Sequence, residues 1–158
     1  MSRTIGYSGS YGWAGQNPTK LRNTLIRAND AFETLRKTVK FDAIAFCGSS
    51  GAAFAFPLAV SHKIPLIYVR KTGEQSHGNP VECNGEGRIK KYLIVDDFIA
   101  SGATVEWIAA QVKKYSKGDV KPAVVGVFCF EDTDQNAFKR DFGFGPIQIY
   151  TPKWIFKK

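Results

Sequence analysis

Long apolar runs and a cysteine framework are both missing from this sequence. No apolar stretch approaches the roughly 18 residues that a membrane-spanning helix requires, and the N-terminus lacks the apolar segment of a secretory signal peptide. The three cysteines, Cys47, Cys83 and Cys129, are an odd and widely spaced set that matches neither a disulfide framework nor a zinc site. These absences predict a protein of the reducing cytoplasm that has no membrane partner.

Acidic residues are scarce compared with basic ones. Lys and Arg number 22 against 14 for Asp and Glu, which gives a formal net charge of +8. A basic protein can bind nucleic acid, but a small polyanionic substrate also requires positive potential, and composition does not separate the two. The chain has no internal repeat, low-complexity segment or linker, so its 158 residues are expected to form one domain.

The stretch 92–104 combines an apolar strand, two acids and a hydroxyl-bearing turn. Asp96 and Asp97 follow the strand, Ser101 and Gly102 follow in a short loop, and a helical pattern of apolar residues begins directly afterwards. Such a turn can bind an anion, because free N–H groups and the positive end of the helix dipole face it. The two acids suit the vicinal hydroxyls of a sugar and a nearby Mg²⁺. The alternative is an ordinary strand-to-helix turn with capping residues.

The apolar spacing elsewhere predicts alternating helices and strands. We expect helices at 17–39 and 52–61, strands at 41–47, 64–69, 92–95 and 122–130, and a long polar loop at 70–91. The aromatic tail after residue 140 is expected to form an edge strand or a hairpin. Alternation of this kind implies a mainly parallel sheet flanked by helices. Because ligands bind beyond the carboxyl ends of parallel strands, the turns at 48–51, 70–71 and 96–104 should converge on one crevice.

Two of these turns carry features of their own. Residues 48–51 read Gly-Ser-Ser-Gly, so small side chains leave backbone N–H groups accessible to an anion, although Gly-Ser turns are common. Arg70 and Lys71 close the next strand with two cations, which either neutralise an anionic ligand or simply cap the strand. The first turn matches neither a dinucleotide fingerprint nor a P-loop.

The string at 92–104 resembles the phosphoribosyl-pyrophosphate (PRPP) motif of the type I phosphoribosyltransferases. The motif consists of a hydrophobic strand, Asp-Asp, three mostly apolar residues, Thr or Ser, Gly, any residue and Thr. The resemblance covers roughly 40–130 and implies an α/β fold with a central, mainly parallel sheet, flanking helices and a small variable hood. The core would span about 18–130, with the hood formed from 1–17, from 131–158 or from both.

The resemblance implies transfer of a 5-phosphoribosyl group from PRPP to a nucleobase, with release of pyrophosphate and with Mg²⁺ as cofactor. The acids Asp96 and Asp97 would hold the ribose hydroxyls and Mg²⁺, directly or through water, and would act in catalysis with Lys71 and His77. The 5-phosphate would be bound by Ala100, Ser101, Gly102, Ala103 and Thr104. The pyrophosphate would be bound by Gly48, Ser49, Ser50, Gly51, Arg70 and Lys71.

The loop after residue 70 is similar to the mobile loop of orotate phosphoribosyltransferases. Those enzymes carry a similar Arg-Lys and end the loop in His-Gly, as His77-Gly78 does here, although a solvated histidine is the alternative. The second lysine of that family falls near Glu74 or Gln75, and the spacing is one residue longer. This departure leaves the base open. A neighbouring subunit supplies a lid cation in the orotate family, which predicts a homodimer whose lid is formed by 72–90.

Aromatic residues of the tail are candidates for contact with the base. Tyr150 or Trp154 would stack on the base, or would instead be core residues of an edge strand. An alternative function is a PRPP- or nucleotide-sensing regulator of the same fold that binds nucleic acid through its basic surface. The sequence carries no added winged-helix length that would favour such a regulator. A transferase that serves nucleotide or nucleic-acid modification, and not nucleobase salvage, is a third possibility.

Overall fold

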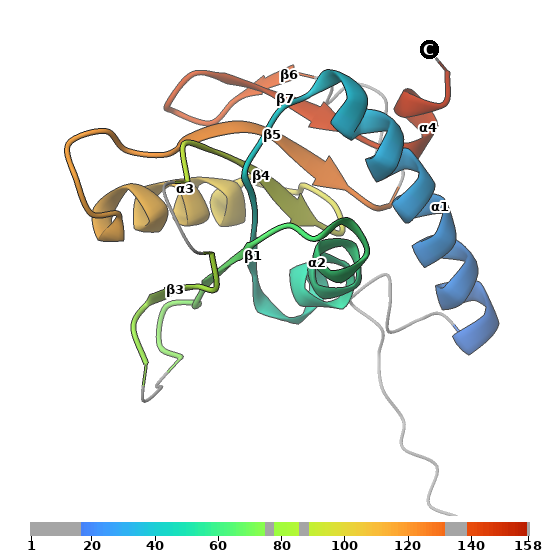
Figure 1. Cartoon of the computed structure of the whole chain (residues 1–158), viewed down its shortest axis with the longest axis horizontal. Helices are drawn as coiled ribbons and strands as arrows, with labels where there is room; N and C mark the ends of the chain where they lie inside the picture. The colour runs from blue at the N-terminus through green and yellow to red at the C-terminus, as the bar shows by residue number, and fades with distance from the viewer. Residues whose placement is uncertain (1–16, 75–77, 86–88, 132–138, 158) are drawn as a thin grey trace, which may run out of the picture.

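The protein is built around a single mainly parallel sheet, which a computed structural model describes at residues 17–74, 78–85, 89–131 and 139–157 (Figure 1). Within these residues the sheet has seven strands in the order β3-β2-β1-β4-β5-β7-β6. The five central strands pair in parallel, and β3 and β6 pair antiparallel at the two edges. The strands are β1 (Ala43–Cys47), β2 (Leu66–Val69), β3 (Val81–Cys83), β4 (Lys91–Asp96), β5 (Ala123–Cys129), β6 (Lys139–Asp141) and β7 (Pro146–Tyr150).

Helices cover both faces of the sheet. The helices are α1 (Pro18–Thr38), α2 (Gly48–His62), α3 (Ala103–Tyr115) and α4 (Pro152–Ile155). The helices α1, α2 and α4 share one core with the β1 side chains of Ile44 and Phe46, whereas α3 shares the other with Ala43 and Ala45. Successive side chains of β1 therefore contribute in turn to the two cores, as expected for a strand buried on both faces. No helix in the described part is long and apolar enough to cross a membrane.

The first helix begins where the sequence predicts. The Asn17 side chain caps it by accepting a 2.9 Å hydrogen bond from the Lys20 backbone N–H, and Pro18 occupies the first turn. Phe32 and Leu35 on its apolar stripe are fully buried against the sheet. This helix therefore packs on the core.

The second helix corrects the sequence analysis. A turn was expected at 48–51 with a helix after it, but α2 starts at Gly48, so these four residues form its first turn. Gly48 has a φ of +69°, which only glycine adopts without strain and which lets the chain pass from β1 straight into the helix. Pro57 lies inside the helix, as expected.

The region 70–91 also differs from the expectation of an irregular loop. A three-residue strand, β3, pairs antiparallel with β2 through Val81–Cys83. The Asn84 side chain accepts a 2.7 Å bond from the Leu66 N–H and continues the pairing beyond the strand. A strand this short, with one half-buried residue and two exposed ones, leaves no apolar period that could be detected.

The aromatic tail forms the expected hairpin, which is followed by the short helix α4. Strand β7 lies inside the sheet beside β5, and β6 forms the edge. Tyr150 at the end of β7 is 8% exposed, and its ring lies over Gly126 of β5. A Cβ at Gly126 would lie 2.5 Å from Cε2 of Tyr150, so the glycine makes room for the ring.

We therefore predict that Gly126→Ala destabilises the protein by about 1–3 kcal/mol, because the added methyl group overpacks the contact with Tyr150. Thermal unfolding would measure the change. In Gly126→Ala/Tyr150→Leu the smaller residue relieves the clash, so the double variant should lose less stability than the sum of the single variants. A Gly126→Ala variant with an unchanged melting temperature would contradict this packing.

Candidate functional site

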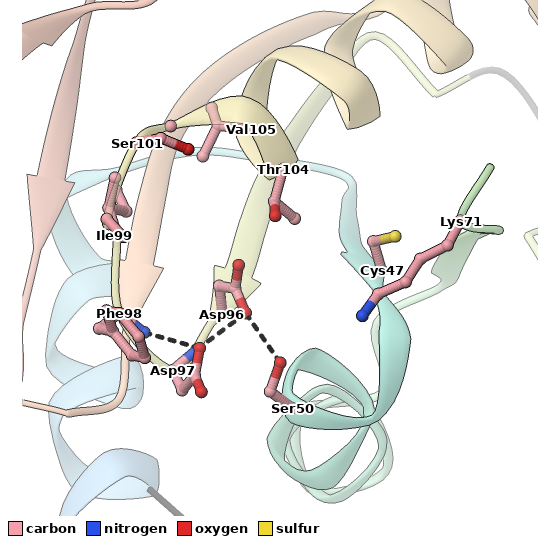
Figure 2. A pocket seen from close by; sticks show the side chains of 12 residues that line it. Cys47, Ser50, Lys71, Asp96, Asp97, Phe98, Ile99, Ser101, Thr104 and Val105 are labelled. Atoms are coloured by element: carbon pink, nitrogen blue, oxygen red, sulfur yellow. Dashed lines mark hydrogen bonds between the residues drawn. The ribbon is translucent and has the colours of Figure 1, made fainter. Parts of the chain in front are cut away.

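A cleft opens at the carboxyl ends of β1, β2 and β4, where three turns meet (Figure 2). It encloses a cavity of about 180 Å³. Its lining comes from all three turns that were expected to converge: Cys47, Ser50, Lys71, Asp96, Asp97, Phe98, Ile99, Ala100, Ser101, Gly102, Thr104 and Val105. Segments about 50 residues apart in the chain thus form one site, because parallel strands end at the same edge.

The two acids form the floor of the cleft. Asp96 and Asp97 are only 7% and 4% exposed. Oδ1 of Asp96 accepts bonds from the Asp97 N–H at 3.0 Å and from the Ser50 hydroxyl at 3.3 Å. Oδ1 of Asp97 accepts a 2.9 Å bond from the Phe98 N–H. Among the described residues, Oδ2 of Asp97 is buried and has no hydrogen-bond partner, so an acceptor oxygen is left for a ligand.

Burial makes the doubly charged form of this carboxylate pair unfavourable. Burial raises the pKa of Asp96 from 3.8 to about 7, and repulsion from Asp97 adds to the shift. Hydrogen bonds from the Asp97 backbone and from Ser50 oppose the shift without cancelling it. A bound cation would remove the repulsion. Mg²⁺ commonly binds through one or two carboxylates together with oxygens of a phosphorylated substrate, so the pair fits this ion.

The turn above the acids leads into α3. Gly102 is buried, with φ 90° and ψ −4°, a left-handed conformation that favours glycine. The Ser101 hydroxyl accepts a 3.3 Å bond from the Ala103 N–H and so stabilises the turn. Ala103 is exposed and does not line the cleft, whereas Thr104 does. Of the predicted 5-phosphate residues, the structure therefore brings all but Ala103 to the cleft.

The first turn of α2 contributes one hydroxyl group to the cleft and contacts the Lys71 side chain. Ser50 reaches the cavity, but Ser49 is exposed and lies outside its lining. A Cβ at Gly48 would lie 2.6 Å from Cε and 3.0 Å from Nζ of Lys71, so the lysine side chain crosses directly over this glycine. Gly51 packs tightly on the sheet, where a Cβ would lie 3.0 Å from Val95 O.

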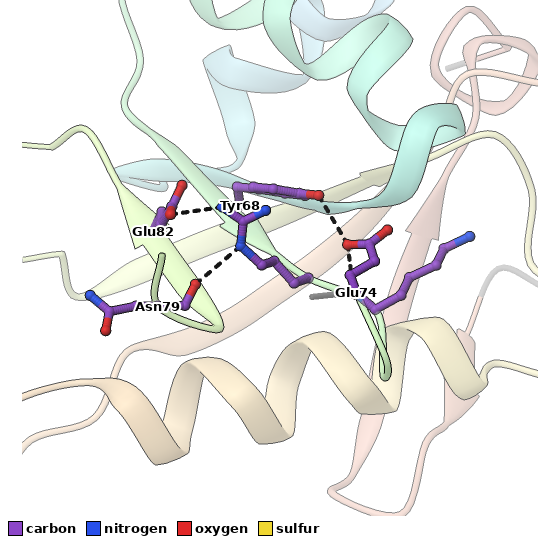
Figure 3. Close-up of polar contacts among 6 residues, drawn as sticks. Tyr68, Glu74, Asn79 and Glu82 are labelled. Carbon is purple, nitrogen blue, oxygen red and sulfur yellow. Dashed lines mark hydrogen bonds and ion pairs between the residues drawn. The ribbon is translucent and has the colours of Figure 1, made fainter. Parts of the chain in front are cut away.

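Arg70 is not in the cleft, contrary to the prediction. Its guanidinium forms a 2.8 Å ion pair with Glu82, donates to the Asn79 carbonyl and lies 5.0 Å from the centroid of the Tyr68 ring (Figure 3). Consecutive residues of an extended chain project to opposite sides. Arg70 and Lys71 therefore diverge, and only Lys71 enters the cleft.

Glu74 fixes the turn that carries Lys71, a role that the sequence analysis missed. Its carboxylate accepts bonds from the Lys71 N–H at 3.0 Å and from the Tyr68 hydroxyl at 3.1 Å (Figure 3). Its own N–H donates to the Lys71 carbonyl at 3.2 Å. On the other side, the Trp107 indole donates a 2.8 Å bond to the Arg70 carbonyl. The acid three residues after the lysine was the available signal, since this spacing closes a turn.

Other expected residues lie elsewhere. His77 falls outside the described residues. Tyr150 and Trp154 pack edge to face at 5.4 Å and line a separate cavity between α1, β7 and α4, so the structure does not bring them to the cleft. The aromatic side chain in the cleft is Phe98, which is 41% exposed. Burial raises the pKa of the Cys47 thiol to about 11, which keeps it protonated at neutral pH.

Comparisons with known proteins agree with this architecture, although no family model matches the chain. The adenine phosphoribosyltransferase of Malacoplasma penetrans (strain HF-2) is 33% identical over 99 residues, which are 54% of this chain and 58% of the relative. The chain thus spans a little over half the length of that curated relative.

Two solved structures are similar. The adenine phosphoribosyltransferase of Saccharomyces cerevisiae, 21% identical, aligns with a TM-score of 0.59 over 86% of this chain and 80% of its own. The orotate phosphoribosyltransferase of Aeropyrum pernix, 16% identical, aligns with a TM-score of 0.54 over 89% and 76%. These likenesses confirm the predicted type I phosphoribosyltransferase fold. They do not favour an orotate enzyme over an adenine enzyme.

The Glu74 turn yields a prediction in which two effects have opposite signs. Removing a carboxylate near Lys71 should strengthen anion binding if only charge mattered. We predict that Glu74→Ala weakens pyrophosphate binding about three- to tenfold, because the turn that holds Lys71 over Gly48 is released. Calorimetric titration with pyrophosphate would measure it.

The matched control is Glu82→Ala, which removes a carboxylate that pairs with Arg70 outside the cleft. Its pyrophosphate affinity should stay within about twofold of that of the unmodified protein. Tighter binding in Glu74→Ala, or an equal loss in both variants, would contradict the positioning role of Glu74.

Proposed function

We propose that this chain, which has the fold of the type I phosphoribosyltransferases, transfers the 5-phosphoribosyl group of PRPP to a nucleobase nitrogen and releases pyrophosphate. The observation that carries the proposal is the buried pair Asp96 and Asp97, which lines the same cleft as a helix N-terminus and a lysine. A sugar that bears an anionic group at each end would contact the acid pair, the helix N-terminus and the lysine at the same time. An isolated phosphate would require only the helix N-terminus.

The 5-phosphate would lie at the start of α3. Gly102 leaves space for a phosphate close to the backbone, and the dipole of a 13-residue helix favours negative charge there. Thr104 and Ser101 supply hydroxyl groups at the rim of the same turn. Because the Ala103 N–H is already bonded to Ser101, the neighbouring N–H groups of the turn would be the backbone donors.

The ribose and a divalent cation would lie above the acids. Oδ2 of Asp97 is available to accept a bond from a ribose hydroxyl or to bind Mg²⁺, directly or through water. Mg²⁺ would supply charge that offsets the developing negative charge on the leaving pyrophosphate. Ser50 holds the Asp96 carboxylate in place from α2, so the pair keeps its orientation as charge builds up.

The leaving pyrophosphate would lie beside Lys71, next to the first turn of α2. The Lys71 side chain packs directly over Gly48, which brings its ammonium group to this turn. Bond cleavage at the anomeric carbon leaves an oxocarbenium-like sugar, so neutralising the leaving group and excluding water would be the main contributions of these residues. Arg70 takes no part in this arrangement, because Glu82 and Tyr68 hold it on the other side of β2.

The base remains the open part of the proposal. Phe98 is the exposed aromatic of the described cleft and could stack on a purine or a pyrimidine ring. A hood formed from residues outside the core would add selectivity. We also propose a homodimer, because the second loop lysine of the orotate family falls near Glu74 or Gln75 here, and an added cation would then have to come from a neighbouring copy.

The test is a panel of nucleobases incubated with PRPP and Mg²⁺, with pyrophosphate release as the readout. At least one base should give turnover, and Asp96→Asn/Asp97→Asn should lower it by more than about a hundredfold. The variant should remain folded, because these acids face the cleft and removing their charge relieves repulsion. Asp119→Asn in an exposed loop is the control and should keep full activity. No turnover with any base, or full activity in the double variant, would overturn the proposal.

A further inference from the structure

The excess positive charge of this protein does not lie in the cleft. The titratable residues that line the cleft include one lysine, Lys71, and two acids, Asp96 and Asp97. The formal charge of +8 must therefore be located elsewhere. One group of exposed lysines lies at the opposite, amino end of the parallel strands.

Four adjacent strands each have lysine at their amino end. In the sheet order β2-β1-β4-β5, the strands begin at Leu66, Ala43, Lys91 and Ala123. The lysines in the same order are Lys63, Lys40, Lys90 with Lys91, and Lys121, and all are exposed. Neighbouring strands lie about 4.8 Å apart, so the four positions span roughly 15 Å in a row.

Backbone bonds hold this row together. The Ile44 N–H donates to the Pro65 carbonyl at 2.9 Å, and the Ala123 N–H donates to the Lys90 carbonyl at 2.8 Å. Oδ2 of Asp42 accepts 2.9 Å bonds from the N–H groups of both Lys90 and Lys91. The segments that enter the four strands are therefore fixed side by side at one edge.

The end of α3 extends the same basic surface. Figure 1 shows the C-terminal end of α3 and its connection to β5 at the end of the sheet where β4 and β5 begin. The exposed residues Lys113, Lys114 and Lys117 lie on this segment. Tyr115 is 41% exposed, and the Lys114 ammonium group lies 5.2 Å from the centroid of its ring. An aromatic face thus stands beside the lysines.

Few described acids balance the charge of this surface. We call its lysines the amino-edge lysines: Lys40, Lys63, Lys90, Lys91, Lys113, Lys114, Lys117 and Lys121. Among the residues that the structure describes, the nearby acids are Asp42, whose carboxylate is bonded to backbone N–H groups, and Asp119. In the described segments no amino-edge lysine is ion-paired with a carboxylate. The ammonium groups of Lys40 and Lys121 instead donate to backbone carbonyls, which leaves their charge uncompensated.

We propose that the amino-edge lysines bind a single-stranded nucleic acid. A narrow row with one or two cations per strand matches one chain of phosphates, and Tyr115 offers a face on which a base can stack. A membrane surface fits less well, because binding in the lipid interface requires an apolar face as well as charge. The large exposed apolar side chains of the described segment are Tyr115 and Val120, and the exposed side of α3 carries Glu106, Lys113 and Lys114, so no continuous apolar face is present there.

This interaction is separate from the proposed transfer reaction. The cleft lies beyond the carboxyl ends of the strands, and the lysine row lies before their amino ends, so a bound strand would leave the cleft open. Nucleic acid would then be a binding partner and not the substrate. A failure of the transfer assay would leave this proposal untouched, because its readout is binding.

The experiment is fluorescence anisotropy with a labelled 20-nucleotide single strand of mixed sequence, as RNA and as DNA, over a series of salt concentrations. The unmodified protein should bind, with an affinity that falls steeply as salt rises. Lys40→Gln/Lys90→Gln/Lys121→Gln should weaken binding at least tenfold and lower the log–log salt slope by about 2. Melting temperatures should fall only slightly, since these side chains are exposed and the lost contacts are the bonds of Lys40 and Lys121 to carbonyls at helix ends.

The matched control removes the same charge elsewhere. Lys20→Gln/Lys153→Gln/Lys157→Gln changes three exposed lysines on α1 and the C-terminal segment and should weaken binding less than threefold. Equal losses in both triple variants would show binding through net charge alone and would overturn the proposal. So would displacement of the strand by saturating PRPP, no binding at all, or tighter binding to anionic vesicles than to the oligonucleotide.

Discussion

The site depends on the cost of keeping two neighbouring carboxylates buried at the end of β4. Asp96 and Asp97 are adjacent in sequence and almost fully covered, so burial and the Asp97 carboxylate raise the free energy of ionising Asp96. The free protein offsets part of this cost with the Ser50 hydroxyl and two backbone N–H groups. One oxygen of Asp97 is left without a partner. A ligand that supplies hydroxyl donors or a cation would remove the remaining cost, and this is the physical basis for locating substrate here.

The charge distribution gives the molecule two different ends. The cleft at the carboxyl ends of the strands is lined by the acid pair and, among the described residues, a single lysine, whereas the amino ends carry a row of lysines. A net charge of +8 was compatible with a polyanionic substrate, yet the lining of the cleft does not account for it. In the proposed function the cleft would bind anions through backbone N–H groups, a helix dipole and one positioned ammonium group, which need little net charge. The excess positive charge is thus available for a separate partner.

Most of the sheet and the floor of the cleft could be predicted from the sequence, because both depend on local patterns. Apolar runs mark the buried parallel strands, and the Asp-Asp and Ser-Gly pairs mark the turn beside them. The prediction fails where tertiary contacts decide. Arg70 turns away from the cleft because Glu82, on a strand too short to detect, forms an ion pair with it. Tyr150 is an inner residue because Gly126 leaves room for its ring, which no local pattern in the tail reveals.

Proton release on substrate binding is the most direct test of the acid pair as the substrate site. The pKa of Asp96 is raised to about 7 in the free protein, so near pH 6.5 much of the protein holds a proton there. A bound cation or ribose hydroxyl favours the charged form and lowers this pKa. Calorimetric titration with PRPP and Mg²⁺ in two buffers of different ionisation enthalpy should therefore show more proton release near pH 6.5 than near pH 8.5. Asp96→Asn should abolish that part of the release. Equal proton release by the unmodified protein and Asp96→Asn, with PRPP bound to both, would contradict the account.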